Sequence, residues 1–154
     1  MNYKEIFQEI ATEITQIENL GQVASYIPEL ALIDTNQFGI HLTTVDNENY
    51  SLGAADKKFS IQSISKVFSL TLAFMLEKDN LWERVGVEPS GTSFNSLLQL
   101  EYEKGIPRNP LINAGALVIC DILISNLKNP LQELIEFIRT LSGNSFIDYN
   151  PKVA

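Results

Sequence analysis

Apolar residues concentrate in one long stretch that follows the charged segment 56–58 and runs from Phe59 to Leu76. Its apolar positions fall on several faces of a helix, which is typical of a helix buried in a core: Ile64, Val67, Phe68, Phe74, Met75 and Leu76. Lys66 is unexpected there, because an ammonium group removed from water is costly unless it is paired or neutral. Ser63 lies three positions earlier and shares the helix face of Lys66. This Ser-x-x-Lys pattern places a hydroxyl beside an amine that desolvation can turn into a base, which is the minimum equipment of a serine nucleophile without histidine.

A second Ser-x-x-Lys pattern, from Ser125 to Lys128, provides an internal comparison. It ends an apolar run just before Asn129-Pro130, so Lys128 is expected to be exposed near the end of a helix. Ser63 instead lies where a helix would begin, and the free N–H groups and positive dipole end of a first turn suit a developing oxyanion. Context therefore favours Ser63 and Lys66 as a catalytic pair. A helix-start serine beside a lysine that reaches out to solvent is the structural alternative.

The first sixty residues predict an amphipathic helix followed by a β-hairpin. Isoleucines recur every three or four positions, at Ile6, Ile10, Ile14 and Ile17, and Gly21 is placed to end this helix. Pro28 lies in a loop that precedes a possible short helix. Alternating apolar residues between Phe38 and Thr44 predict a half-buried strand, and the polar segment 46–49 predicts a turn that returns as a partner strand over 50–53.

The second half of the chain predicts mainly helices. The segment 85–113 is rich in Gly, Pro, Ser and Asn, which indicates loops with one short helix near Phe94 to Leu100. A helix is predicted from Ala114 to Ser125, with Asn113 as its N-cap. Another begins at Pro130, with Gln132 in a capping-box position, and ends at Gly143. Its apolar stripe consists of Leu131, Leu134, Ile135, Ile138 and Leu141.

These elements predict an α/β protein of the α+β type whose sheet is incomplete. Only two strands are visible, and an isolated two-stranded hairpin is marginal in water, so the sheet edges indicate that more chain belongs to the fold. We expect residues 1–59, with the first helix and the hairpin, to belong to a sheet layer. Residues 60–154 are expected to form a mostly helical layer, and both are expected to be parts of one larger catalytic domain.

Composition and charge argue against several classes of function. The 154 residues are 45% hydrophobic and 19% charged, with a formal net charge of −8, which argues against a nucleic-acid or anionic-membrane partner. The N-terminus lacks the pattern of a signal peptide, and the longest apolar stretch is too short and too polar to span a membrane, so a cytoplasmic protein is expected. Cys120 is expected to be a small core residue in a reducing compartment. His41 is expected to face solvent, and neither it nor any other pattern suggests a metal or organic cofactor.

Three stretches together resemble the serine-dependent glutaminase family, which shares its fold with the class A β-lactamases and penicillin-binding proteins. They are Gly21–Ala31 (GQVASYIPELA), Phe59–Lys66 (FSIQSISK) and Asn109–Ala116 (NPLINAGA). The intervening Val87–Gly91 and Phe94-Asn95 are also similar to that family. The resemblance covers most of the chain in the same order and at similar spacing, and is far more specific than Ser-x-x-Lys alone.

The resemblance implies roles for five residues. Ser63 would attack the side-chain carboxamide of L-glutamine, Lys66 would accept its proton, and the backbone N–H of Ser63 would contribute to an oxyanion hole. Tyr26, Gln62 and Asn113 match positions that line the substrate pocket, with Tyr26 as a hydrogen-bond donor or proton relay. Without the resemblance, Tyr26 would be an ordinary loop aromatic and Asn113 an ordinary N-cap.

The chain departs from the family in length. Members of the family are considerably longer, so this chain resembles their N-terminal part and is expected to have little or no activity alone. The resemblance implies a homo-oligomer. Two other functions stay open: a different serine acyltransferase on the same fold, or a non-catalytic interaction module that pairs through its sheet edge and apolar surface.

Overall fold

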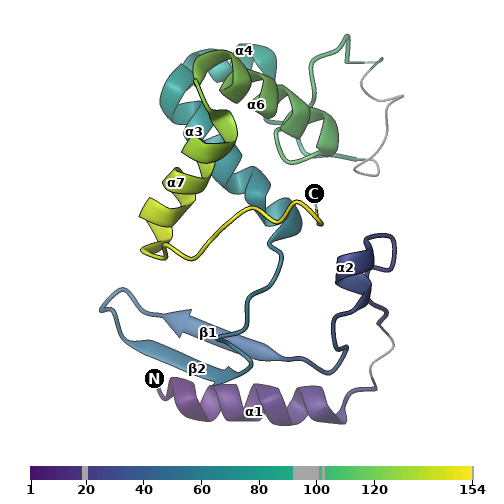
Figure 1. Ribbon diagram of the computed structural model, residues 1–154, viewed down its shortest axis with the longest axis vertical. Helices are drawn as coiled ribbons and strands as arrows, with labels where there is room; N and C mark the ends of the chain where they lie inside the picture. The colour runs from purple at the N-terminus through teal and green to yellow at the C-terminus, as the bar shows by residue number, and fades with distance from the viewer. Residues whose placement is uncertain (19–20, 92–100, 102, 154) are drawn as a thin grey trace. The chain divides into compact units, whose positions relative to one another are not determined.

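The computed structural model describes residues 1–18, 21–91, 101 and 103–153, and the chain divides into two compact units (Figure 1). The first unit contains Met1–Ser60 and Asn150–Ala154, and the second contains Ile61–Tyr149. Helices and one two-stranded antiparallel sheet make up the described chain, as the sequence predicts for an α+β protein. The short helix expected near residues 94–100 lies outside the described residues.

In the first unit, helix α1 (Tyr3–Gln16) packs along a hairpin of β1 (Gly39–Thr43) and β2 (Asn49–Gly53), with the ring of Tyr3 5.2 Å from that of Tyr50 (Figure 1). The strands are antiparallel, with Ile40 opposite Leu52. Side chains alternate along both strands, and those on the covered face are half-buried: Ile40, Leu42, Tyr50 and Leu52. The predicted hairpin and its period of two are therefore confirmed.

Helix α1 ends earlier than the isoleucine pattern predicts. Its last residue is Gln16, and Ile17 is already extended, with φ −82° and ψ 127°, so Gly21 does not end the helix. Thr12 and Thr15 donate their hydroxyls to carbonyls of the preceding turn, and β-branched residues favour the helix less than unbranched ones. The predicted short helix after the loop is present as α2 (Pro28–Ala31), with Pro28 at its start.

Polar side chains organise the hairpin turn. Asn47 has φ 61°, a left-handed conformation that Asn tolerates well. The hydroxyl of Tyr50 donates to Glu48 at 2.8 Å, and this hydrogen bond to a carboxylate raises the pKa of Tyr50. His41 is exposed, as predicted, with Nε2 3.1 Å from the hydroxyl of Thr43. The turn is therefore held by short-range contacts, and the histidine belongs to this solvent-facing network.

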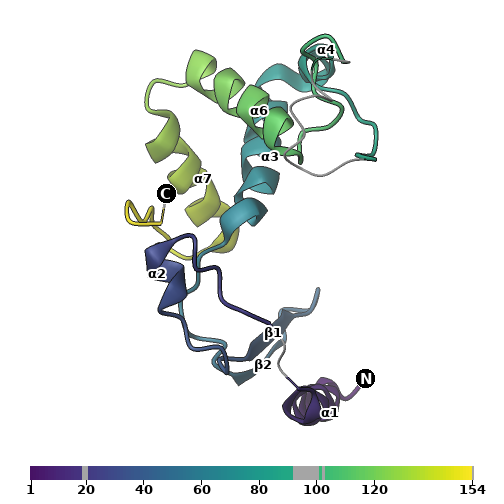
Figure 2. The same cartoon turned by 90° about the vertical axis from the view of Figure 1, so that its right-hand side faces the viewer.

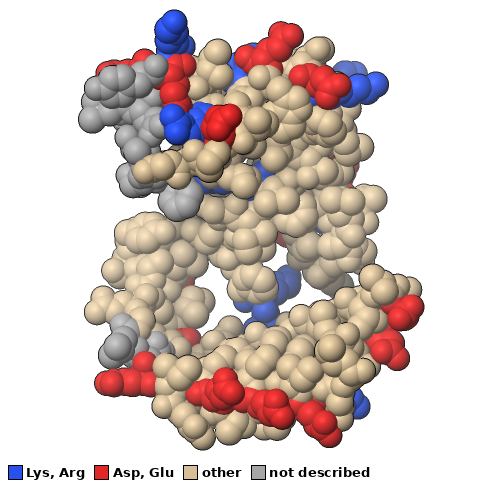
Figure 3. All heavy atoms as spheres, turned by 180° about the vertical axis from the view of Figure 1, so that it is seen from behind, with Lys and Arg blue, Asp and Glu red and all other residues tan. Residues whose placement is uncertain are grey.

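The solvent face of α1 is acidic. Glu5, Glu9 and Glu13 recur every four residues and are exposed, and acidic side chains run along this unit in Figure 3. Like charges at this spacing repel one another slightly and keep the helix face in water. These exposed glutamates therefore account for part of the negative net charge of the chain.

In the second unit, α3 (Ser65–Glu77) and α6 (Asn113–Asn126) pack against each other, and α7 (Pro130–Ser142) also contacts α3 (Figure 2). The remaining elements are η1 (Gln62–Ile64), η2 (Lys78–Asn80) and α4 (Leu81–Arg84). The core consists of apolar side chains from α3, α4, α6 and the residue after α4: Ala73, Leu81, Val85, Ile119, Ile122 and Leu123. These contacts fix the mutual position of α3 and α6, which carry the candidate site.

Two predictions of burial are wrong in this unit. Ala73 is the one buried residue of α3, whereas Val67 and Met75 are 52% and 61% exposed. Cys120, expected in the core, is exposed on α6 between the exposed Leu117 and Ile124. Both helices are apolar on several sides, but each packs on one side only within the described residues. Periodicity identifies such helices correctly, but it does not supply the partners that would bury them.

Helix α7 begins with Pro130 and ends at Gly143, which has φ 64°, as predicted. Its first turn differs from the prediction, because Glu133 and not Gln132 accepts the backbone N–H of Asn129, at 2.9 Å. A carboxylate accepts more strongly than an amide and also suits the positive helix end.

In the described part of the chain, no single helix has the length and apolar character needed to cross a membrane. Taken together, α6 and α7, which are bent by 103°, meet those criteria.

Candidate active site

Ser63 lies in the 3-10 turn η1, and α3 begins two residues later at Ser65. The hydroxyl of Ser65 donates to the carbonyl of Gln62 at 2.7 Å, and its backbone N–H points at the carbonyls of Gln62 and Ser63. Ser63 is exposed. The Ser-x-x-Lys pattern therefore crosses the junction of a 3-10 turn and an α-helix, which presents the serine hydroxyl at the helix start instead of within it.

Gln62, directly before Ser63, has φ 46°. Left-handed backbone in a residue with a Cβ costs about 1–2 kcal/mol and is held only where the surroundings impose it. The hydroxyl of Ser65 donates to the carbonyl of Gln62 and closes the turn that begins at this residue. Strain of this kind is common beside reacting groups, because it fixes a neighbouring side chain in one direction.

This strain predicts that glycine is more stable than alanine at position 62, which is the reverse of their usual order in a helix. Gln62→Gly should be more stable than Gln62→Ala by about 1 kcal/mol, because glycine adopts positive φ without cost. The matched pair at exposed Gln132, inside α7, should show the opposite order, with Ala more stable by about 0.5–1 kcal/mol. Urea unfolding of the four variants measures both differences. Ala more stable than Gly at both positions would show that Gln62 is not strained.

Lys66 lies in the first turn of α3 and is half-buried. Its Nζ donates to Asn113 Oδ1 at 2.7 Å and to the carbonyl oxygen of Leu111 at 3.0 Å. Both acceptors belong to the start of α6 and the loop before it. The sequence predicts that a lysine in an apolar helix is either paired or neutral, and the two acceptors found here are neutral oxygens.

Asn113 is the first residue of α6 and not its N-cap, which is a correction of the predicted helix start. Ile112 takes the cap position, with an extended ψ of 159°, and no side chain caps the helix there. The side-chain oxygen of Asn113 accepts from Lys66 instead. The hydrogen bond from Lys66 Nζ, at 2.7 Å, thus takes the place of a capping bond from a backbone N–H.

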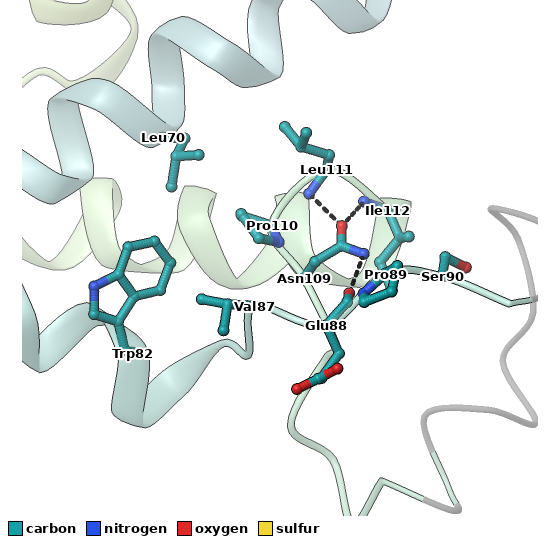
Figure 4. Close-up of a pocket in the computed structure, with 10 residues that line it drawn as sticks. All are labelled: Leu70, Trp82, Val87, Glu88, Pro89, Ser90, Asn109, Pro110, Leu111 and Ile112. Carbon is teal, nitrogen blue, oxygen red and sulfur yellow. Dashed lines mark hydrogen bonds between the residues drawn. The ribbon is translucent and has the colours of Figure 1, made fainter.

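The loop before α6 is shaped by Asn109 (Figure 4). Asn109 Oδ1 accepts the backbone N–H groups of Leu111 and Ile112 at 3.0 and 3.1 Å, and its Nδ2 donates to the carbonyl of Glu88 at 2.9 Å. The same loop lines one side of an open pocket of about 570 Å³, whose other walls include Leu70, Trp82, Val87 and Pro89. Ser63, Lys66 and Asn113 are not among the described residues that line this pocket.

Tyr26 belongs to the other unit, in the turn before α2, and is 78% exposed. The second unit contains the other four predicted site residues, of which Lys66 and Asn113 bond directly and Gln62 and Ser63 are adjacent. The role of Tyr26 stays a prediction.

The second Ser-x-x-Lys pattern, from Ser125 to Lys128, lies at the end of a helix, as predicted. Lys128 is exposed beyond the end of α6.

Sequence reasoning missed two members of this arrangement, Asn109 and the carbonyl of Leu111. The carbonyl has no side-chain signal and is found only from the structure. Asn109 precedes Pro110, and Asn-Pro favours the start of a turn, so this dipeptide was the available signal.

Comparison with known proteins identifies the family. The glutaminase family model matches residues 21–154, which include all five candidate residues. The chain belongs to the glutaminase family. A glutaminase of Saccharophagus degradans is 59% identical over 154 residues, covering all of this chain and 50% of the relative, and one of Christiangramia forsetii is 53% identical, with 51% of the relative covered. The chain therefore spans about half the length of these glutaminases.

Solved glutaminase structures confirm the predicted fold class. The probable glutaminase ybaS superimposes with a TM-score of 0.80 at 32% identity, over 92% of this chain and 47% of that one. A probable glutaminase of Bacillus subtilis, in complex with 6-diazo-5-oxo-L-norleucine, gives a TM-score of 0.65 at 32% identity over 92% of this chain and 40% of that one. The resemblance found in the sequence thus extends to the three-dimensional arrangement, and the two-stranded sheet agrees with a fold that is incomplete in this chain.

Proposed function

We propose that this chain carries the nucleophile and the base of an enzyme that hydrolyses L-glutamine to L-glutamate and ammonia through a γ-glutamyl ester of Ser63. One observation supports it most directly: Nζ of Lys66, one helical turn from Ser63, is held by two neutral acceptors. A neutral amine has two N–H groups and one lone pair. Leu111 and Asn113 would accept from both N–H groups and leave the lone pair for the hydroxyl of Ser63.

In the first half of the reaction, Ser63 Oγ attacks the side-chain carbonyl carbon of glutamine while Lys66 Nζ takes the hydroxyl proton. The carbonyl oxygen gains negative charge, which the backbone N–H of Ser63 at the helix start stabilises. The carbon–nitrogen bond then breaks, and the proton held by Lys66 passes to the leaving nitrogen, which departs as ammonia. The product of this half is the γ-glutamyl ester of Ser63.

In the second half, water attacks the ester carbonyl and gives up a proton to Lys66. The bond between carbon and Ser63 Oγ breaks, the proton returns to Oγ, and glutamate leaves. Lys66 thus exchanges a proton with Ser63 in both halves, and no metal or organic cofactor takes part in the proposed steps.

Asn113 and Gln62 would contact the substrate beside the reacting atoms. A contact from Asn113 to the substrate carboxylate would come from its N–H₂ group, because a carboxylate only accepts hydrogen bonds. Tyr26 would supply a hydroxyl as hydrogen-bond donor or proton relay. The rest of the pocket would come from the part of the family domain beyond this chain, and the enzyme would act as a homo-oligomer in the cytoplasm.

The proposal predicts that the 154 residues alone release little or no ammonia. An extended form, in which residues 1–154 are joined to the part of the Saccharophagus degradans relative that this chain does not cover, should be active. Ammonia release from L-glutamine by both forms measures the difference, with L-asparagine as a comparison substrate. A rate for the 154 residues comparable to that of the extended form would contradict the prediction.

The competing acyltransferase function is tested with penicillin. If Ser63 belongs to an enzyme of that class, labelled penicillin should acylate the extended form at Ser63. The glutaminase proposal expects no such label, and it expects 6-diazo-5-oxo-L-norleucine to inactivate the extended form with covalent attachment. Penicillin labelling at Ser63 together with absent glutamine hydrolysis would favour the acyltransferase.

A further inference from the structure

Both polar atoms of the Asn109 side chain form hydrogen bonds with the main chain of two loops. It is half-buried between two buried prolines, Pro107 and Pro110. Its oxygen accepts the N–H groups of Leu111 and Ile112, and its nitrogen donates to the carbonyl of Glu88 (Figure 4). A half-buried amide with three main-chain partners fixes the course of both loops.

One of these bonds holds the peptide group that Lys66 also contacts. The carbonyl of Leu111 and the N–H of Ile112 belong to the same planar trans peptide and point in opposite directions. Asn109 Oδ1 binds the N–H side at 3.1 Å, and Lys66 Nζ binds the carbonyl side at 3.0 Å. Rotation of this peptide would break both bonds, so Asn109 determines the direction of the carbonyl that Lys66 uses.

The surrounding backbone keeps Asn109 itself in place. The N–H of Gly86 donates to the carbonyl of Pro107 at 2.8 Å, and the N–H of Glu88 donates to that of Arg108 at 2.9 Å. These bonds pair the segment 86–88 with 107–108. On the other side, Gly115 of α6 lies against the backbone of Asn109, since a Cβ added at Gly115 would be 2.0 Å from the Asn109 carbonyl oxygen. The asparagine is therefore anchored independently of Lys66.

We propose that Asn109 is a positioning residue for catalysis, which orients the 111–112 peptide so that Lys66 holds its amine toward Ser63. The inference rests on the proposed glutaminase function. Without Asn109, the 111–112 peptide is free to turn, and Lys66 loses the orientation given by its bond to Leu111. The reaction then slows, while the substrate contacts proposed for Gln62 and Asn113 are kept.

Three variants of Asn109 in the extended form test this. Asn109→Ala removes all three bonds and should lower kcat about 10- to 100-fold with KM for L-glutamine within about threefold. Asn109→Asp keeps an acceptor at the same position for the N–H of Ile112 and should recover most of kcat. Asn109→Gln keeps the amide chemistry but displaces it by one methylene, and should be slower than Asn109→Asp. Steady-state kinetics by ammonia release gives both constants.

The matched control is Asn126→Ala. Asn126 also ties two elements together, since its Nδ2 is 2.9 Å from Glu77 Oε1 at the end of α3 and 2.9 Å from the carbonyl of Ile122. Its loss should reduce stability without changing kcat. A kcat for Asn109→Ala within about threefold of the unsubstituted form would overturn the inference. If that variant does not fold, Asn109→Gln faster than Asn109→Asp would overturn it.

The proposed function and the role of Asn109 are distinguished by separate results. If Ser63→Ala leaves glutamine hydrolysis unchanged, the proposed function is wrong. If hydrolysis depends on Ser63 but the Asn109 variants keep the full kcat, the function stands and only the role of Asn109 is refuted.

Discussion

Replacing Ser63 with Ala in the extended form is expected to lower kcat for glutamine hydrolysis by at least about 10³-fold. The variant has no oxygen to form the ester, and the remaining donors and Lys66 can at most assist a direct attack by water. The substitution removes one exposed oxygen from η1, so the stability of the fold should hardly change. Ammonia release with a coupled assay measures kcat, and thermal unfolding checks the fold.

The chain supplies a matched control in its second Ser-x-x-Lys pattern. Ser125 is exposed near the end of α6, with exposed Lys128 three residues later. Ser125→Ala should leave kcat unchanged. Equal activity of the Ser63→Ala and unsubstituted forms would remove Ser63 from the mechanism, whatever the family likeness.

Gly115→Ala is expected to destabilise the fold by about 3 kcal/mol. A Cβ at this position would lie 2.0 Å from the carbonyl oxygen of Asn109 and 2.8 Å from the Cα of Pro110. These neighbours are backbone atoms, which cannot move aside as the end of a side chain does. Alanine also favours a helix by about 1 kcal/mol over glycine, but this gain is smaller than the cost of the overlap. Urea unfolding measures the change.

The same substitution should also lower kcat, because it displaces the loop that holds Lys66. Gly91→Ala is the control, since no atom of the described residues lies within 4 Å of a Cβ added there, and its stability should change by no more than about 0.5 kcal/mol. A stable and fully active Gly115→Ala variant would mean that α6 does not approach the Asn109 backbone so closely.

Local patterns in the sequence predict the hairpin, the start of α7 at Pro130 and the left-handed Gly143. Each depends on a few neighbouring residues whose conformational preferences agree. The sequence also predicts that Lys66 is either paired or neutral, because an unpaired cation in an apolar helix is costly. Its partners are 45 and 47 residues away, and spacing along one helix gives no information about them.

Two of the wrong predictions, for Asn113 and Cys120, have a common physical cause. In both cases tertiary contacts outweigh the local preference of the sequence. A contact that forms draws Asn113 away from the cap position, and a contact that is missing within the described residues leaves Cys120 exposed. Asn113 bonds to a lysine from a distant helix. The apolar face around Cys120 has no cover within the described residues, and the chain spans about half the length of its relatives. Burial depends on the whole domain, whereas helix and strand periods do not.

Detection of the γ-glutamyl ester on Ser63 would test the proposed mechanism most directly. The extended form is mixed with L-glutamine, stopped with acid during turnover, digested with trypsin and analysed by mass spectrometry. Trypsin would release Phe59–Lys66, which contains Ser60, Ser63 and Ser65, and fragment ions distinguish the three. We predict one added glutamyl group on Ser63, absent without glutamine and in Ser63→Ala. Ongoing ammonia release with the adduct on another residue, or with Ser63 never modified, would contradict the account.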